Sequence, residues 1–172
     1  MRFRTWPTLG LLLLGCTRSN PALPQPEHPE RYWIERTDAE LEAALSTACT
    51  TAQSQSKPVL LVFSAPWCID CRQVWALEHQ PALAEERTHW EEVVVHVGRL
   101  DRHRSLLDAF GVRAIAHWVA LAPRDCSRTV TDWPVLRAST FEPATGWFGA
   151  KTETELRDWL FEARQNGPTR AP

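Results

Sequence analysis

The sequence predicts a single α/β domain with a central mixed sheet flanked by helices. Two short, continuous apolar runs, residues 59–63 and 93–97, are typical of strands buried on both faces of a mainly parallel sheet. Segments with apolar residues at helical spacing alternate with these runs, and a third strand-like run covers residues 115–121. The chain has 172 residues, which is the size of one domain with tails.

Two capping boxes mark the first and last helices of this domain. Thr37-Asp-Ala-Glu40 precedes apolar residues at helical spacing and predicts a helix over residues 38–52. Thr152-Glu-Thr-Glu155 predicts a closing helix that Asn166-Gly-Pro168 ends. We also expect a helix over residues 68–79 with a second piece after Pro81, a short helix over 105–110, a hairpin strand over 127–131 and a loop over 132–146.

Composition and charge narrow the function classes. Hydrophobic residues make up 44% of the chain and nine residues are Trp, so the chain can form a core and is not wholly disordered. The chain has 19 Lys and Arg residues and 21 Asp and Glu residues, so it lacks the excess of positive charge that would suggest nucleic-acid binding. The five cysteines are more informative, because an odd number in a short chain implies that they have different roles.

The amino terminus has the features of a secretory signal. Arg2 and Arg4 precede an apolar stretch that is shorter than the roughly 20 residues of a membrane-spanning helix. The stretch closes at Leu13-Leu-Gly-Cys16, which resembles a bacterial lipobox and implies cleavage before Cys16 and lipid attachment to its sulfur. An ordinary secretory signal is the alternative.

These features predict a lipoprotein that is anchored in the bacterial cell envelope and faces the periplasm. Residues 1–15 are the expected signal peptide, and residues 16–35 carry the lipidated cysteine and a proline-rich, extended tether. The folded domain is then expected over residues 36–165, with a tail over 166–172.

The motif Trp67-Cys-Ile-Asp-Cys71 is the strongest chemical signal. A structural zinc site normally needs a second Cys or His pair at short spacing, which the sequence lacks. The motif follows a predicted buried strand and begins a helix, where free backbone N–H groups stabilise a thiolate at Cys68. Such a thiolate attacks a disulfide, and Cys71, one turn further on, can resolve the mixed disulfide. A purely structural disulfide is the alternative.

The stretch from Lys57 to Arg72 resembles the thioredoxin superfamily, and in particular the C-terminal periplasmic domain of the transmembrane thiol:disulfide interchange reductases. Residues 110–117 are similar to the second signature of that superfamily. The resemblance implies a thioredoxin-like fold and a thiol-disulfide oxidoreductase. Its site would contain Cys68 as nucleophile, Cys71 as resolving thiol, Trp67 on the substrate-facing surface, and Ile115 and Ala116 on the backbone edge that binds substrate.

The same resemblance implies the partners. They are disulfide-containing proteins and an upstream thiol donor, and no separate cofactor is expected because the dithiol carries the two electrons.

At three positions the sequence differs from the pattern of the thioredoxin superfamily. Val62 replaces a buried acid that accepts the proton of the resolving thiol, so we expect slow resolution. Ala116 replaces a cis-proline; because a cis bond before a non-proline residue costs about 2.5–4 kcal/mol, we expect a trans bond and an altered, narrower substrate edge. Asp70 precedes Cys71, and its charge should offset the effect of the helix on Cys68 and favour a reducing couple.

Further cysteines and a histidine leave alternatives open. His117 could join Cys68 and Cys71 in a soft metal site, so the competing function is a thioredoxin-like binding module that holds a metal or docks a partner. Cys49 and Cys126 could form a second disulfide. Nothing in the sequence brings their Cα atoms within the necessary distance of about 7 Å, so we expect two separate thiols.

Overall fold

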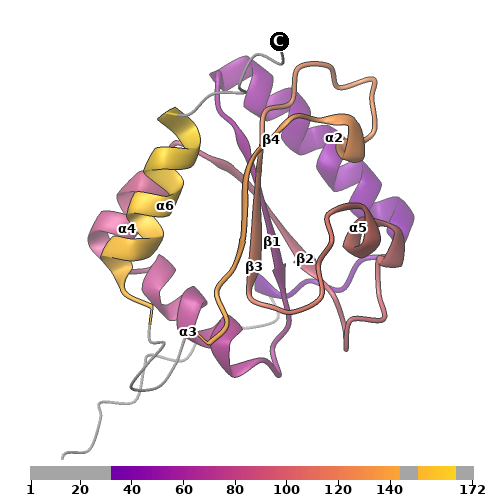
Figure 1. Cartoon of the computed structure of the whole chain (residues 1–172). Coiled ribbons are helices and arrows are strands. Elements are labelled where there is room, and N and C mark those ends of the chain that lie inside the picture. Colours follow the sequence, from indigo (N-terminus) through magenta and orange to yellow (C-terminus); the bar gives the residue numbers. More distant parts are fainter. Residues whose placement is uncertain (1–31, 144–150, 166–172) are drawn as a thin grey trace, which may run out of the picture.

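A mixed four-stranded sheet lies between two layers of helices (Figure 1). The structure is a computed structural model, and it describes residues 32–143 and 151–165. The four strands lie in the order β2-β1-β3-β4, with β1 parallel to β2 and antiparallel to β3, and with β3 antiparallel to β4. Their bounds are Val59–Ser64 for β1, Glu91–His96 for β2, His117–Leu121 for β3 and Val135–Thr140 for β4.

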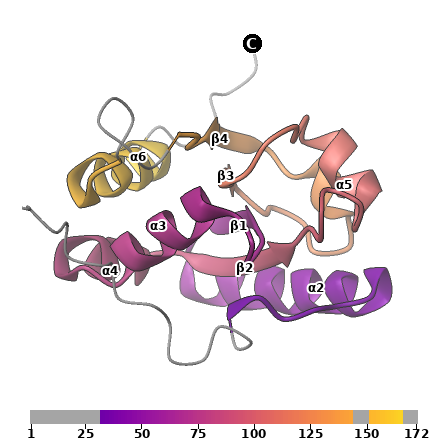
Figure 2. The ribbon, with the colours of Figure 1, turned by 90° about the horizontal axis from the view of Figure 1, so that it is seen from below.

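The helices cover both faces of this sheet. One face carries α3, α4 and α6, and the other carries α2 and α5, as Figures 1 and 2 show from two directions. Their bounds are Asp38–Gln55 for α2, Ile69–Glu78 for α3, Pro81–Arg87 for α4, Arg104–Ala109 for α5 and Glu153–Gln165 for α6. The predicted α/β fold with a central mixed sheet flanked by helices is confirmed.

Strand β1 is the centre of the core. All six of its residues are buried, as its continuous apolar run predicts, because helices cover it on both faces and strands pair with it on both edges. On the α6 side, the ring of Trp118 lies edge-on to those of Phe141 and Trp159, at centroid distances of 4.9 and 5.6 Å. Edge-on aromatic pairs add about 0.5–1.5 kcal/mol each to the stabilisation from burial.

The first helix begins at the predicted capping box. The Thr37 backbone N–H donates to the Glu40 carboxylate at 2.7 Å, and the Glu40 N–H donates back to the Thr37 hydroxyl at 3.3 Å. The helix ends three residues later than predicted, because Ser56 adopts the left-handed conformation and its N–H reaches the carbonyls of Ala52 and Gln53.

The expected hairpin strand over residues 127–131 is wrong. Residues Val130–Asp132 form a short 3-10 helix, and the antiparallel partner of β3 is β4, which falls in the stretch expected as a loop. The reason is that β4 is an edge strand whose residues are exposed or half-buried throughout. Such a strand needs no apolar run, so it leaves little periodic signal in the sequence.

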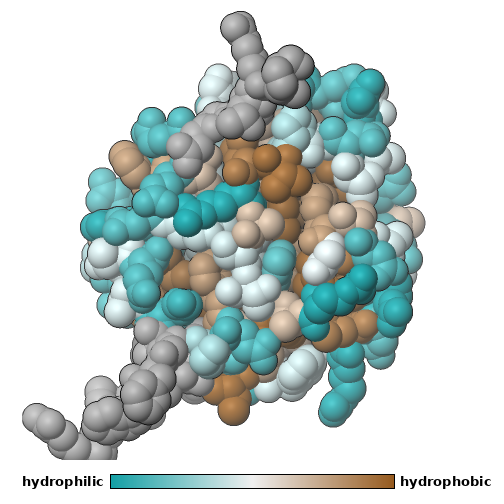
Figure 3. Space-filling model, viewed as in Figure 1, coloured by the Kyte–Doolittle hydropathy of each residue, from teal (hydrophilic) through white to brown (hydrophobic). Residues whose placement is uncertain are grey.

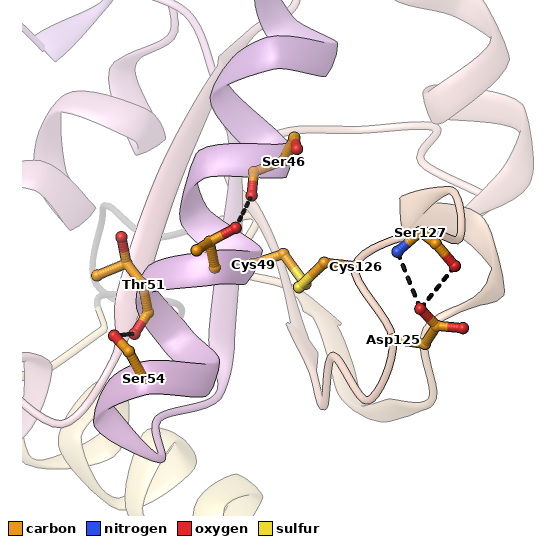
Figure 4. The surroundings of a disulfide bond; sticks show 8 residues. Ser46, Cys49, Thr51, Ser54, Asp125, Cys126 and Ser127 are labelled. Atoms are coloured by element: carbon orange, nitrogen blue, oxygen red, sulfur yellow. Dashed lines mark hydrogen bonds between the residues drawn. A yellow bond between two sulfur atoms is a disulfide. The ribbon is translucent and has the colours of Figure 1, made fainter.

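The expectation of separate thiols at Cys49 and Cys126 is also wrong. The two residues form a disulfide between α2 and the segment after β3, with Cα atoms 5.7 Å apart (Figure 4). Val130 and Trp133, further along that segment, are buried in the core and hold it against the helix layer. The cysteines are 77 residues apart, so only the tertiary fold brings them together.

The packed domain begins before residue 36, inside the segment expected as a tether. Trp33 is buried and donates its indole N–H to the Ser64 hydroxyl at 2.8 Å, and the Tyr32 hydroxyl donates to the Glu78 carboxylate at 2.9 Å. These contacts with β1 and α3 make residues 32 and 33 part of the folded domain. The predicted signal peptide, the lipidation site at Cys16, the rest of the tether and the tail lie outside the described residues.

The face of the molecule shown in Figure 3 is mainly hydrophilic, and hydrophobic residues appear on it in separate patches. Across residues 32–143 and 151–165, no helix is both long and apolar enough to cross a membrane.

Candidate active site

Cys68 caps helix α3 with its own sulfur. Its backbone is extended, with φ −76° and ψ 121°, and its Sγ accepts a hydrogen bond from the Cys71 backbone N–H at 3.1 Å. The first N–H groups of a helix have no partner within the helix and carry partial positive charge. A sulfur in this position is therefore stabilised as a thiolate, and the predicted place of Cys68 at the start of the helix is confirmed.

The two thiols of the motif differ in acidity. The pKa of Cys68 lies below that of an ordinary thiol, chiefly because it accepts a hydrogen bond from the Cys71 side chain, while burial and the charge of Asp70 act in the opposite direction. The pKa of Cys71 lies well above the ordinary value, chiefly because of burial and then because of Cys68. Cys68 is therefore the thiol that ionises first.

The segment before β3 closes the site on the other side. The Cys68 thiol donates to the Ile115 carbonyl, with sulfur and oxygen 3.5 Å apart. The Ile115–Ala116 peptide bond is cis, so the expectation of a trans bond is wrong, and the altered substrate edge inferred from it is dropped. Contacts hold both sides of this bond, because the Ala116 carbonyl accepts the Phe141 N–H at 2.8 Å. The prediction of a trans bond used only the free-energy cost of a cis bond before a non-proline residue, because the sequence does not show these tertiary contacts.

Apolar side chains flank Cys68 on the surface. Trp67 is 48% exposed and Ile69 is 62% exposed, whereas Cys68 itself is only 6% exposed. The indole N–H of Trp67 donates to the Gly98 carbonyl at 2.6 Å, so the loop after β2 holds the ring in place. Gly98 has φ +59°, and a Cβ there would come within 2.3 Å of the Asp101 carboxylate, so this loop conformation requires glycine.

A surface depression of about 460 Å³ lies beside the Cys68 sulfur. It brings together most of the site residues predicted from the sequence, while Cys71 and Ala116 are each only 1% exposed and do not line it. The depression is lined by Trp67, Cys68, Ile69, Asp70, Leu100, Arg113, Ala114, Ile115 and Glu142. Leu100, Arg113 and Glu142 were not predicted, because they come from separate segments that share no motif with the cysteines.

His117 does not join the two cysteines. Its neighbour Trp118 packs on α6, so His117, one residue earlier in the strand, points to the opposite face of the sheet. There its ring lies 6.1 Å from that of Phe63, and its Nδ1 is 2.7 Å from the Thr140 hydroxyl. The described part of the chain holds no group of three or more His, Cys, Asp or Glu residues that could bind a metal ion.

Val62 is buried, and its side chain puts no carboxyl group at the position of the missing acid. Two other residues around Cys71, Ser64 and Trp33, were not identified from the sequence. Two residues after Val62 on the same strand, the buried hydroxyl of Ser64 lies close enough to the Cys71 side chain to lower the pKa of that thiol. Trp33, from the supposed tether, donates to that hydroxyl. A single Ser at the end of an apolar strand, and a Trp outside the expected domain, gave no local signal.

Comparisons with solved structures show which known folds this chain is similar to. No family model and no curated protein matches the chain. Among solved structures, a disulphide isomerase from Xylella fastidiosa Temecula1 is 22% identical and has a TM-score of 0.59, with the match covering 75% of this chain and 95% of that one. The oxidised C-terminal domain of DsbD from Neisseria meningitidis is 20% identical, with a TM-score of 0.50 and coverage of 74% and 97%.

The chain therefore has a thioredoxin-like fold, as the sequence resemblance implied. Within this fold it carries a pair of unbonded cysteines, Cys68 and Cys71, at the N-terminus of α3. Together these observations define the class as a thioredoxin-like fold that carries a Cys-x-x-Cys dithiol at the start of a helix.

Proposed function

We propose that the protein reduces disulfide bonds of other proteins through Cys68 and Cys71. The observation that carries the proposal is the asymmetry of the pair: the Cys68 sulfur accepts a helix N–H beside an open depression, whereas Cys71 is buried behind it. A stabilised sulfur at the edge of a depression suits a nucleophile, and a more deeply buried neighbour within the same helical turn suits a resolving thiol.

The reaction follows from these two roles. The Cys68 thiolate attacks one sulfur of the substrate disulfide, and the other substrate sulfur leaves with the bonding electrons and takes a proton from water. Cys71 then loses its proton to water and attacks the Cys68 sulfur, which releases the second substrate thiolate. The protein has lost two electrons and gained the Cys68–Cys71 disulfide, and the substrate disulfide has become two thiols.

Asp70 supports the reducing direction. Its negative charge raises the pKa of Cys68 and so opposes the stabilisation of the thiolate. A dithiol whose reduced form is less stabilised is a stronger reductant, because a highly stabilised thiolate makes the disulfide oxidising. An upstream thiol donor must then restore the dithiol after each cycle.

We place this reaction in the bacterial cell envelope. The signal-like amino terminus and the lipobox-like Leu13-Leu-Gly-Cys16 support a periplasm-facing lipoprotein with a lipid on Cys16. The Cys49–Cys126 disulfide also supports an oxidising compartment, where such bonds form and persist. The intact mass of the protein from bacterial membranes tests this, because lipid should be present on the parent chain and absent after Cys16→Ser.

Reduction of insulin tests the activity. With a small-molecule dithiol as the electron donor, we expect catalytic turnover, and equilibration against a glutathione buffer should give a potential closer to that of a reductant than to that of an oxidase. An absence of turnover from a fully reduced protein would contradict the proposal. Metal content of the purified protein, measured in parallel, addresses the competing role as a metal-binding module.

A further inference from the structure

We propose that the Ser64 hydroxyl, oriented by the Trp33 indole, donates a hydrogen bond to the Cys71 thiolate in the step that resolves the mixed disulfide. This inference rests on the proposed function, because it assigns a role within the same reaction. It concerns the second half of that reaction, in which a buried thiol must become an anion.

The location of Ser64 suits this role. It is the last residue of β1, on the strand face that meets α3, and it is 2% exposed beside Cys71, which is 1% exposed. The hydroxyl lies close enough to the Cys71 side chain to lower the pKa of that thiol. Val62, two residues earlier on the same strand, has no group that could accept a proton or donate a hydrogen bond. Ser64 therefore supplies polarity at Cys71 where the expected acid is missing.

Trp33 determines how the hydroxyl can act. An indole N–H only donates, so in the 2.8 Å bond between Trp33 Nε1 and Ser64 Oγ the hydroxyl oxygen is the acceptor. A hydroxyl has one hydrogen and two acceptor positions, so this bond leaves its hydrogen free to donate. The indole is itself held between other rings, 5.0 Å from Tyr32 and 6.5 Å from Trp75 of α3.

The chemical consequence is stabilisation of charge. Burial raises the pKa of Cys71, while the Ala65 backbone N–H and the Ser64 hydroxyl lower it. A hydroxyl is too weak a base to keep the proton of the thiol, so the proton goes to water and Ser64 stabilises the sulfur anion that remains. The Cys71 sulfur then forms its bond to Cys68 Sγ as the substrate sulfur leaves with its electron pair. Trp33 acts through Ser64 and is a positioning residue.

Ellman's reagent separates the two halves of the reaction in one experiment. The full chain carries Cys16→Ser, so that Cys68 and Cys71 are its free thiols, and the reduced protein meets one equivalent of reagent in a stopped-flow instrument. Attack by Cys68 releases a first coloured thiolate, and attack by Cys71 releases a second. The first phase reports the nucleophile, and the second reports resolution.

We expect Ser64→Ala to leave the first phase unchanged and to slow the second about tenfold, because hydrogen bonds to charged groups are among the stronger ones. The pH dependence of the second phase should move to higher pH. Ser64→Thr, which keeps the hydroxyl, should restore most of the rate. Trp33→Phe, which keeps an aromatic ring but removes the donor, should slow the second phase by a smaller factor of about three.

These outcomes are distinguishable from a failure of the proposed function. If the parent protein shows no first phase, Cys68 is not a nucleophile and the proposed function fails. If both phases occur and Ser64→Ala resolves at the parent rate with an unmoved pH profile, the role of Ser64 is overturned. Should Ser64→Ala fail to fold, Trp33→Phe decides, because a parent rate and profile in that variant would contradict the orientation of the hydroxyl.

Discussion

The two cysteine pairs of this domain lie on opposite sides of the same sheet and have opposite characters. Cys68 and Cys71 are three residues apart in sequence, remain unbonded, and occupy the first turn of α3. Cys49 and Cys126 are 77 residues apart and joined, and they connect α2 to the segment after β3 (Figure 4). The proposed redox role of Cys68 and Cys71 therefore rests on where these sulfurs lie, and not on the number of cysteines in the chain.

The surroundings of each pair explain the difference. Cys68 borders an open depression, and its sulfur accepts an N–H from the start of a helix. Cys49 is fully buried within α2, away from any helix N-terminus, and packs among the residues of the core. The first environment stabilises a thiolate, and the second protects a covalent link between distant segments.

The largest expected effect is the loss of exchange in Cys68→Ser. Without the sulfur at the helix N-terminus no mixed disulfide can form, so insulin reduction should fall to the background rate. The double variant Cys49→Ala/Cys126→Ala is the matched control, and it should keep most of the parent turnover at a temperature where it is folded. Equal losses in both variants would remove the distinction between the pairs.

The second prediction concerns stability. A disulfide that closes a loop of 77 residues restricts the unfolded chain, so Cys49→Ala/Cys126→Ala should lower the free energy of unfolding by about 4 kcal/mol. Denaturant unfolding in the absence of reductant measures this change. Reduction of Cys68 and Cys71 alone serves as the comparison, and a similar loss on opening either pair would contradict a structural role specific to the Cys49–Cys126 bond.

The third prediction adds the missing acid beside the active pair. Val62→Asp should accelerate release of the substrate thiol from the mixed disulfide by about tenfold, because a nearby carboxylate can take the proton of Cys71. Val62→Asn has a side chain of the same shape but cannot act as a base, so it controls for the cost of a buried polar group in β1. If neither variant is faster than the parent, slow proton transfer does not limit resolution.

The smallest predicted effect is on the acidity of Cys68. Asp70 raises the pKa of this thiol, so Asp70→Asn should lower it further below the ordinary value. The thiolate would then form at lower pH, and the rate of alkylation at Cys68, followed by mass spectrometry of the labelled peptide, should rise at a lower pH than in the parent. An unchanged pH profile would refute the assignment of Asp70.

Local signals predicted much of this structure. The capping box of α2, the buried run of β1 and the placement of Cys68 before a helix each depend on residues close together in sequence. Their physical causes are equally local, since capping involves hydrogen bonds across three residues and burial of a strand follows from its own side chains. The site was therefore found because its motif lies within five consecutive residues.

The features that escaped prediction depend on distant parts of the chain. Strand β4 lies at an edge and needs no apolar pattern, and the Cys49–Cys126 bond forms only once the segment after β3 packs against α2. The cis bond before Ala116 is held by contacts with residues far from it in sequence. Likewise, Trp33 bonds Ser64 across 31 residues, and Trp33 itself belongs to the segment, residues 16–35, whose prolines indicated a tether.

Trapping with Cys71→Ser tests the central claim most directly. Without the resolving thiol, Cys68 should remain covalently joined to a disulfide substrate, so the protein incubated with oxidised insulin and quenched in acid should gain the mass of insulin. Peptide mapping should place the bond at Cys68, and Cys68→Ser/Cys71→Ser should show none. An adduct at Cys49 or Cys126, or no adduct from the reduced single variant, would contradict the assignment of Cys68 as the nucleophile.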